Sequence, residues 1–223
     1  EANLKGNLIT LHNQMRIHAT KETVEWIRNL IDAGVVNEVP IDNDYDIRVF
    51  DSPKELQNAI IEKDNNQKLG ISRLTATYDW EYSSQSKPKD SDYWCVRIGD
   101  WSCPWNRQLA KEKESKHLSW IEQSQTIHEI GSTFTVQGFD LNYVGVIIGP
   151  SVKYRDGKII FDISESKNKS AVQNRKLETG EMINYGETLL KNELNVLLTR
   201  GVNGLYVYAV DEELQKALKN AIK

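Results

Sequence analysis

Apolar positions along the chain alternate between strand-like and helix-like spacing. Short apolar runs predict buried strands at 8–11, 45–50, 69–77, 143–149 and 204–210. Between these runs, apolar residues three and four positions apart predict a helix after Thr20, a second after Ser52, a third over about 186–199 and a last one after Asp211. Strands that alternate with helices indicate an α/β domain whose mostly parallel sheet carries helices on both faces.

Local signals mark the ends of the predicted helices. Thr20 and Asp211 are suitable N-caps, and Gly34 can end the helix that Thr20 begins. The run Ser52-Pro53-Lys54-Glu55 has the pattern of a capping box with proline at the first helical position. These signals depend only on neighbouring residues, so they predict helix boundaries without knowledge of the fold.

The alternation breaks between about 79 and 125, where aromatic residues are interleaved with polar ones. This segment holds Trp80, Trp94, Trp101, Trp105 and Trp120. It is too polar for a core strand and too aromatic for a plain linker, so we expect an insertion, partly a hairpin, at one end of the sheet. Its rings could stack on nucleic-acid bases, or pack on one another as a small core. Packing is the favoured interpretation because tryptophan is usually buried. A second polar excursion, 164–176, is predicted to be a loop.

Composition narrows the class of protein. The 223 residues suit one sizeable α/β domain, and the net charge of -4 argues against a surface devoted mainly to gripping phosphates. Any nucleic-acid contact is therefore expected to be local. Two cysteines, no signal-peptide pattern and no apolar run of about 18 residues predict a cytoplasmic protein without a membrane anchor.

Two stretches carry the functional signal. The first runs from Gln137 to Gly149 and places a Gln-Gly turn and the acidic Asp140 before an apolar strand. The second, 195–211, ends an apolar helix in Thr199-Arg200-Gly201 just before another strand, which places a positive charge at one edge of the sheet. In this order they resemble motifs V and VI of superfamily one helicases, and most closely the Schlafen-like, uncharacterised bacterial DNA/RNA helicase-domain family.

The resemblance covers most of 8–222 and implies a fold and a function. It implies that residues 1–223 form the second RecA-like motor domain of a P-loop NTPase, with its insertion at about 79–125. It implies an ATP-dependent helicase or translocase that works on DNA or RNA. Arg200, and Arg16 in a motif IV-like Gln14-Met15-Arg16, would be catalytic arginines acting on the γ-phosphate. The family often has Tyr-Arg where this chain has Leu194-Asn195, so any contact made there is not carried over.

Further binding residues follow from the same resemblance. Contacts to the nucleotide are expected from Gln14, Gln137, Gly138, Asp140 and Thr199. Contacts to the nucleic-acid backbone are expected from the hydroxyls of Ser132, Thr133 and Thr135.

Some expected chemistry is absent from the chain. There is no G-x-x-x-x-G-K-[ST] loop, and no acidic pair of this chain is expected to hold Mg²⁺. ATP and Mg²⁺ are therefore expected to bind in a longer parent protein with an N-terminal P-loop domain in cis, and not tightly to this chain alone. The chain opens without an initiator methionine, which is typical of an excised domain.

No metal site is predicted in the chain itself. Asp42, Asp44 and Asp46 have the spacing with which an EF-hand calcium loop begins. The loop is incomplete, because Ile47 occupies the position that must be glycine and Pro53 the position of the bidentate glutamate.

Three functions remain open at this stage. The chain could be half of a nucleic-acid motor, or a binding module that kept the fold without catalysis. It could also be a free-standing enzyme such as a small nuclease, although it lacks the clustered carboxylates that two-metal cleavage needs.

Overall fold

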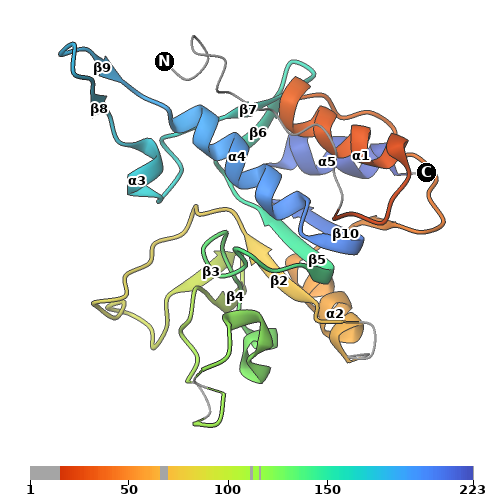
Figure 1. Ribbon diagram of the computed structural model, residues 1–223, viewed down its shortest axis with the longest axis horizontal. Coiled ribbons are helices and arrows are strands. Elements are labelled where there is room, and N and C mark those ends of the chain that lie inside the picture. Colours follow the sequence, from red (N-terminus) through yellow and green to blue (C-terminus); the bar gives the residue numbers. More distant parts are fainter. Residues whose placement is uncertain (1–15, 66–69, 111–112, 116, 223) are drawn as a thin grey trace.

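A four-stranded parallel sheet forms the centre of the molecule. The computed structural model describes residues 16–65, 70–110, 113–115 and 117–222; the predicted strand at 8–11, Gln14 and Met15 lie outside them. The strand order is β1 (Asp46–Val49), β10 (Gly201–Ala209), β5 (Leu141–Ile148) and β2 (Arg73–Ala76), and every neighbouring pair is parallel (Figure 1). The predicted α/β class and parallel sheet are confirmed.

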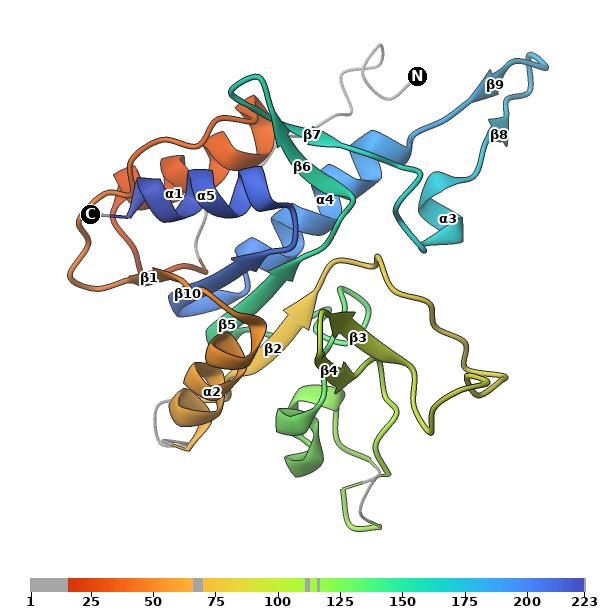
Figure 2. The ribbon, with the colours of Figure 1, turned by 180° about the vertical axis from the view of Figure 1, so that it is seen from behind.

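Helices cover both faces of this sheet. One face carries α1 (Lys21–Arg28) with its π-helical continuation η1 (Asn29–Ala33), α4 (Gly186–Leu198) and α5 (Glu212–Ala221), while α2 (Pro53–Asp64) lies on the other (Figures 1 and 2). Each face of the sheet has its own hydrophobic core: the first lies under α1, α4 and α5, and the second lies under α2. In strand β10, Leu205 and Val207 point into the first core and Tyr206 into the second. Burial on both sides explains why the central strands read as nearly continuous apolar runs.

The helix caps lie where the sequence predicts them. At α1 the Thr20 hydroxyl accepts a hydrogen bond from the Thr23 N–H. At α2 the Ser52 hydroxyl accepts one from the Glu55 N–H. At α5 the Asp211 carboxylate accepts one from the Leu214 N–H. Gly34 ends the first helix in the left-handed conformation at φ 66°. These boundaries are set by local hydrogen bonding.

Close packing of α2 on the sheet requires a glycine in β5. A Cβ atom added to Gly145 would lie 2.7 Å from Cγ1 of Ile60 and 2.8 Å from Cδ1 of Leu74. The second core therefore depends on the missing side chain at this position.

Most of the aromatic insertion packs on the second face, whereas Trp120 and Ile121 near its end belong to the first core. It contains the predicted hairpin, β3 (Cys95–Ile98) with β4 (Trp101–Pro104), and two short 3₁₀ turns, η3 (Trp120–Glu122) and η4 (Ser124–His128). Trp105 is 0% and Trp120 4% exposed, and the Trp105 ring contacts Tyr78 and Trp80 edge-on at centroid distances of 5.3 and 6.4 Å. The packing interpretation is confirmed for these two tryptophans, while Trp80, Trp94 and Trp101 are half-buried.

The structure corrects one expectation about the region 150–185 and adds a hairpin that was not predicted. The predicted loop at 164–176 holds a one-turn helix, α3 (Lys169–Val172), capped by Asn168, and the strand β8 (Arg175–Lys176), which pairs with β9 (Met182–Ile183). A hairpin of β6 (Val152–Arg155) and β7 (Lys158–Phe161) was not predicted. Its Asp156-Gly157 turn has φ of 51° and 78°, and Asp-Gly between apolar runs is a hairpin signal that the sequence did contain. No helix in the described part of the chain is long and apolar enough to cross a membrane.

The buried tryptophan gives a stability prediction. Trp105→Ala should lower the free energy of unfolding by about 3–5 kcal/mol, because it leaves a cavity at the centre of the second core. Tyr93→Ala, at a ring 40% exposed in the same insertion, should change it by less than about 1 kcal/mol. Urea denaturation followed by circular dichroism measures both, and equal effects of the two variants would contradict the packed core.

Candidate nucleotide and nucleic-acid site

The two signature stretches meet at one edge of the sheet. Strands β5 and β10 are parallel neighbours, and the Leu141 N–H donates to the Arg200 carbonyl at 2.9 Å where both strands begin. Because parallel strands start at the same edge, Asp140 and Arg200, which precede them, are brought together there.

The end of α4 positions Arg200. The Thr199 hydroxyl donates to the Asn195 carbonyl at 2.7 Å within the last helical turn. A Cβ atom on Gly201 would lie 2.0 Å from the Gly204 carbonyl oxygen, so only glycine allows the chain to enter β10 here. Thr199, Arg200 and Gly201 thus form the junction between α4 and β10. The predicted contact of Thr199 with the nucleotide stays a prediction.

The Arg200 guanidinium is a buried cation with an unsatisfied donor. The residue is 6% exposed, its Nη1 donates to the Phe139 carbonyl at 3.1 Å, and its Nε is buried without a hydrogen-bond partner among the described residues. Burial lowers the pKa of Arg200, nearby Arg16 lowers it further, and Asp140 acts in the opposite direction. No described carboxylate lies within 4.0 Å of this guanidinium. An anion at this position would satisfy both the charge and the free donor.

Arg16 belongs to the same cluster. Its Nε forms an ion pair with Oδ1 of Asp140, and both side chains are partly exposed. Two guanidinium groups and one carboxylate therefore gather at this edge. Gln14, the other residue expected from this loop, lies outside the described residues.

A groove adjoins the cluster. A cavity of about 380 Å³ lies between the segment 133–137, α3 and α4, and three of the predicted site residues line it: Thr133, Gln137 and Arg200. Gln137 is exposed, and Gly138 turns the chain at φ 85°, a left-handed conformation that favours glycine. The structure brings these residues together, and their ligands stay predictions.

Two of the three predicted hydroxyl groups are engaged inside the protein. Thr135 Oγ1 donates to the Ser132 carbonyl at 2.9 Å and accepts from the Ser132 N–H at 2.8 Å. The Ser132 hydroxyl donates to Oδ1 of Asn106 at 2.8 Å, and both residues are buried. In this conformation a nucleic acid could reach Thr133 but not the hydroxyls of Ser132 and Thr135.

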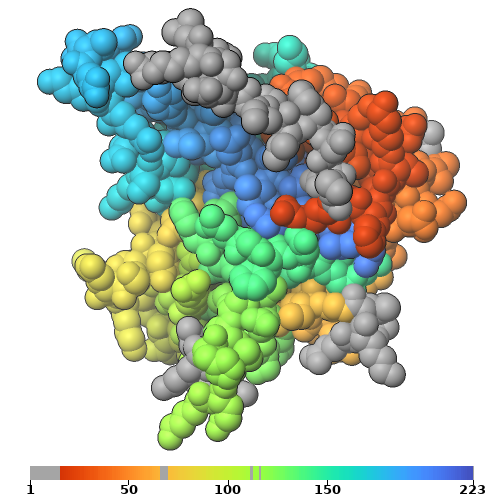
Figure 3. Space-filling view, viewed as in Figure 1, coloured from red at the N-terminus to blue at the C-terminus, as the bar shows by residue number. Residues whose placement is uncertain are grey.

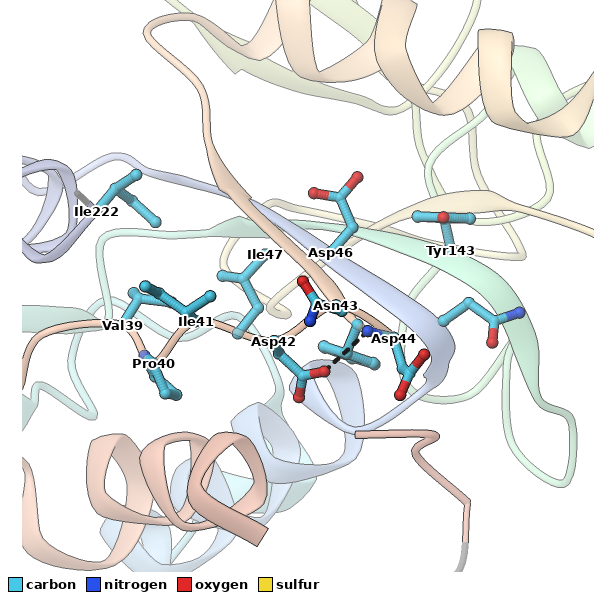
Figure 4. A pocket seen from close by; sticks show the side chains of 12 residues that line it. Val39, Pro40, Ile41, Asp42, Asn43, Asp44, Asp46, Ile47, Tyr143 and Ile222 are labelled. Atoms are coloured by element: carbon cyan, nitrogen blue, oxygen red, sulfur yellow. Dashed lines mark hydrogen bonds between the residues drawn. The ribbon is translucent and has the colours of Figure 1, made fainter. Parts of the chain in front are cut away.

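A second cavity, of about 460 Å³, borders the acidic segment 42–46 (Figure 4). Asp42 accepts hydrogen bonds from the hydroxyls of Thr20 and Thr23 at 2.9 and 2.7 Å, so it supports the start of α1. Asp46 accepts from the Tyr206 hydroxyl at 2.7 Å. Figure 4 shows the carboxylates of Asp42 and Asp46 pointing in opposite directions. The carboxylates of Asp42 and Asp46 are thus engaged in hydrogen bonds that stabilise the fold.

Comparison with known proteins identifies the family. The sequence model of the Schlafen group 3 DNA/RNA helicase domain matches residues 2–211. The chain belongs to this family. The predicted relationship to Schlafen-like helicase domains is thereby confirmed.

Individual relatives add little detail. The uncharacterized protein YPL245W of Saccharomyces cerevisiae is 34% identical over 226 residues, which cover 94% of this chain and 47% of the relative. The chain thus spans about half the length of that protein. The crystal structure of the C-terminal domain of a possible DNA helicase from Lactobacillus plantarum WCFS1 aligns over 93% of this chain and 97% of its own length, at 10% identity and a TM-score of 0.35.

Among the groove residues that sequence reasoning missed, one is a buried acid. Glu193 of α4 lines the groove, is buried, and accepts a hydrogen bond from the Tyr78 N–H at 3.1 Å. Burial and the nearby Asp79 raise the pKa of Glu193 to about 8. Asp79 is also buried, and its Oδ1 has no hydrogen-bond partner in the described part of the chain. The signal was present, since Glu193 interrupts the apolar face that Leu190, Leu194 and Leu197 form.

The raised pKa predicts a pH-dependent stability. Glu193 ionises near 4.5 in an unfolded chain but near 8 in the folded domain. Its contribution is therefore fully present below about pH 4.5 and is lost as the pH rises from there through about 8, because in this range the unfolded chain ionises while burial beside Asp79 keeps the folded carboxyl protonated. Glu193→Gln should flatten this decline. Urea denaturation at intervals from pH 5 to 9 measures it, with Glu187→Gln, an exposed position of the same helix, as control. Identical pH profiles for wild type and Glu193→Gln would contradict the assignment.

Proposed function

We propose that this chain is the C-terminal motor half of an ATP-dependent DNA/RNA helicase or translocase. In this proposal it supplies arginine fingers and nucleic-acid contacts to an N-terminal P-loop domain in cis. The observation that carries the proposal is the buried Arg200 guanidinium, which has an unsatisfied Nε and no described carboxylate within ion-pair distance. Membership of the helicase-domain family supports it.

The chemistry of this cluster fits a phosphate group. A guanidinium keeps its charge under all ordinary conditions and can donate to two phosphate oxygens from one planar fork. Arg200 has one donor held by the Phe139 carbonyl, which orients the group, and Nε remains to meet an anion. The ion pair with Asp140 holds Arg16 at the same edge. The cluster of two cations and one carboxylate keeps a net positive charge although the whole chain carries -4.

ATP with Mg²⁺, bound on the partner P-loop domain, would supply the phosphoanhydride bond. The present chain would contribute positive charge. Its Arg200, and to a smaller extent its Arg16, would stabilise the negative charge that develops on the γ-phosphate oxygens. An arginine finger of this kind accelerates hydrolysis by about 10³–10⁵. Gln137, Gly138, Asp140 and Thr199 would border the nucleotide from the same edge.

Substitution of the arginines in the full-length protein tests this role. Arg200→Ala should lower nucleic-acid-stimulated ATPase activity by at least about a hundredfold and leave ATP affinity within about tenfold, because the contact forms mainly in the transition state. Arg200→Lys should restore little, since a point charge does not replace the fork, and Arg16→Ala should have a milder effect. Arg97→Ala, an exposed arginine of the β3–β4 hairpin, is the control. Normal turnover in a folded Arg200→Ala protein would refute the finger and favour a non-catalytic binding module.

The isolated domain gives a complementary test. Residues 1–223 alone should not hydrolyse ATP above background, with or without nucleic acid, because the chain has no phosphate-binding loop. Phosphate release from the purified domain measures this. Robust turnover would overturn the motor-half proposal in favour of a free-standing enzyme.

A further inference from the structure

Two acidic side chains are buried close together beyond the ends of β2 and β5. Asp79, which follows β2, is 5% exposed, and Glu193 of α4 is 8% exposed. The backbone N–H of Tyr78 donates to Oε1 of Glu193, so the residue next to Asp79 in the chain binds the second carboxyl group directly. Among the described residues, no Lys, Arg or His lies within 4.0 Å of either group. The pair therefore has no neutralising cation in contact with it.

The carboxyl group of Asp79 is anchored through one oxygen only. Its Oδ2 accepts from the Thr77 hydroxyl at 2.9 Å and from the Ser151 N–H at 3.0 Å. A Cβ atom on Gly149 would lie 2.3 Å from this oxygen, so a glycine is needed beside it. The other oxygen, Oδ1, is buried and has no hydrogen-bond partner in the described part of the chain. A buried acceptor of this kind calls for a donor.

One proton held by the pair supplies the missing donor. A protonated Glu193 keeps one oxygen as the acceptor for the Tyr78 N–H, and its O–H becomes a donor. Two ionised carboxylates buried side by side repel each other, so such a pair holds a single proton over a wide pH range. In agreement with this, burial and the charge of Asp79 raise the pKa of Glu193 to about 8.

The other titratable groups around the pair come from the segment after β7, from the residue between the two acids and from the end of α4: Glu165, Lys167, Tyr78 and Arg200. Glu165 adds negative charge, and the side chain of Lys167 is exposed. Burial raises the pKa of the Tyr78 phenol, so it stays neutral near pH 7. Arg200 lines the same groove as Glu193 without an ion pair to it. Figure 1 shows the chain leaving β2 toward α3 and α4, and Figure 3 shows α3 in cyan next to the blue surface of α4. Within the described residues, these surroundings favour retention of the proton.

We propose that Asp79 and Glu193 share one proton near neutral pH, and that this contact positions α4, and with it Arg200, for the proposed reaction. Glu193 lies in the middle of α4, and Arg200 follows about two helical turns later at the junction with β10. The shared proton joins α4 to the segment 77–79, which is itself hydrogen-bonded to the end of β5. Loss of the proton breaks this link and leaves two like charges in one buried place. Glu193 is thus a positioning residue that acts through Arg200. The inference rests on the proposed function and adds a dependence on pH to it.

Infrared difference spectroscopy of the full-length protein tests the shared proton without reference to catalysis. A protonated carboxyl group has a C=O stretching band that an ionised one lacks. Spectra recorded between about pH 6 and 9 should show such a band, which disappears with a midpoint near pH 8. Glu193→Gln should remove it, and Glu187→Gln, at an exposed position of the same helix, should leave it unchanged. Absence of the band from wild type, or its persistence in Glu193→Gln, would overturn the shared proton.

The pH profile of the ATPase reaction in the full-length protein tests the positioning role. The nucleic-acid-stimulated kcat of wild type should fall by about tenfold between pH 7 and 9, while KM for ATP changes by less than about twofold, because the contact of Arg200 forms mainly in the transition state. Glu193→Ala should lower kcat by about tenfold already at pH 7. Glu193→Gln should recover most of that loss and show no alkaline decline, since its amide can donate to Asp79 and accept from Tyr78 without a titrating proton.

A double-variant comparison shows whether Glu193 acts through Arg200. In the Arg200→Ala protein, the further change Glu193→Ala should lower kcat by less than about twofold, because the group that it positions is already missing. The melting temperature of each variant shows whether a loss of activity reflects loss of the fold. Full additivity of the two losses in folded proteins would contradict the positioning role.

The remaining outcomes distinguish this inference from the proposed function. If wild type and Glu193→Gln have the same pH profile of kcat, the positioning role is refuted, while Arg200→Ala still decides the motor role. If Arg200→Ala keeps normal turnover, the proposed function and the positioning role both fall, and the infrared band alone decides whether the proton is shared. If Mg²⁺ alone removes the band from wild type at pH 7 and raises the melting temperature of wild type but not of Glu193→Gln, the pair is a cation site and the proposal is wrong.

Discussion

The parallel pairing of β5 and β10 is the constraint on which the candidate site depends. Val144 and Val146 of β5, with Leu205 and Val207 of β10, enter the first core, while Ile147 and Tyr206 enter the second. A slip of one residue would exchange the two faces of a strand, so the register is set by packing on both sides. This register places Asp140 and Arg200 at one edge, and core packing holds them there without an ion pair between them.

The electrostatic character of that edge follows from how its charges are distributed. Asp140 pairs with Arg16, so no described carboxylate is left within ion-pair distance of Arg200. A buried, incompletely satisfied donor is unfavourable for folding, and each such group calls for a specific explanation, such as a water, an ion or a catalytic role. The hydrogen bond to the Phe139 carbonyl orients the guanidinium but leaves Nε unsatisfied.

The aromatic insertion connects the second core to the groove through Tyr78. The ring of Tyr78 packs edge-on against Trp105 and Phe134. The backbone N–H of Tyr78 donates a hydrogen bond to the carboxyl group of the buried Glu193. The residue lies just after β2, where the chain leaves the sheet to enter the insertion. The small core of the insertion therefore has a structural consequence beyond its own stability: it fixes the wall on which the exposed Phe134 ring stands.

The amino-acid sequence by itself determined the helix starts at Thr20, Ser52 and Asp211, because capping depends on residues within one turn. It also determined the central strands, since burial on both faces demands long apolar runs, and it indicated that Asp140 and Arg200 precede two of them. Only the tertiary structure decided which polar groups of the candidate site remain available to a ligand. The hydroxyl of Ser132 is taken by Asn106, Glu193 lies beside Asp79, and Arg200 keeps a free donor. Each of these outcomes depends on partners distant in the chain, and such partners leave no periodic pattern in the sequence.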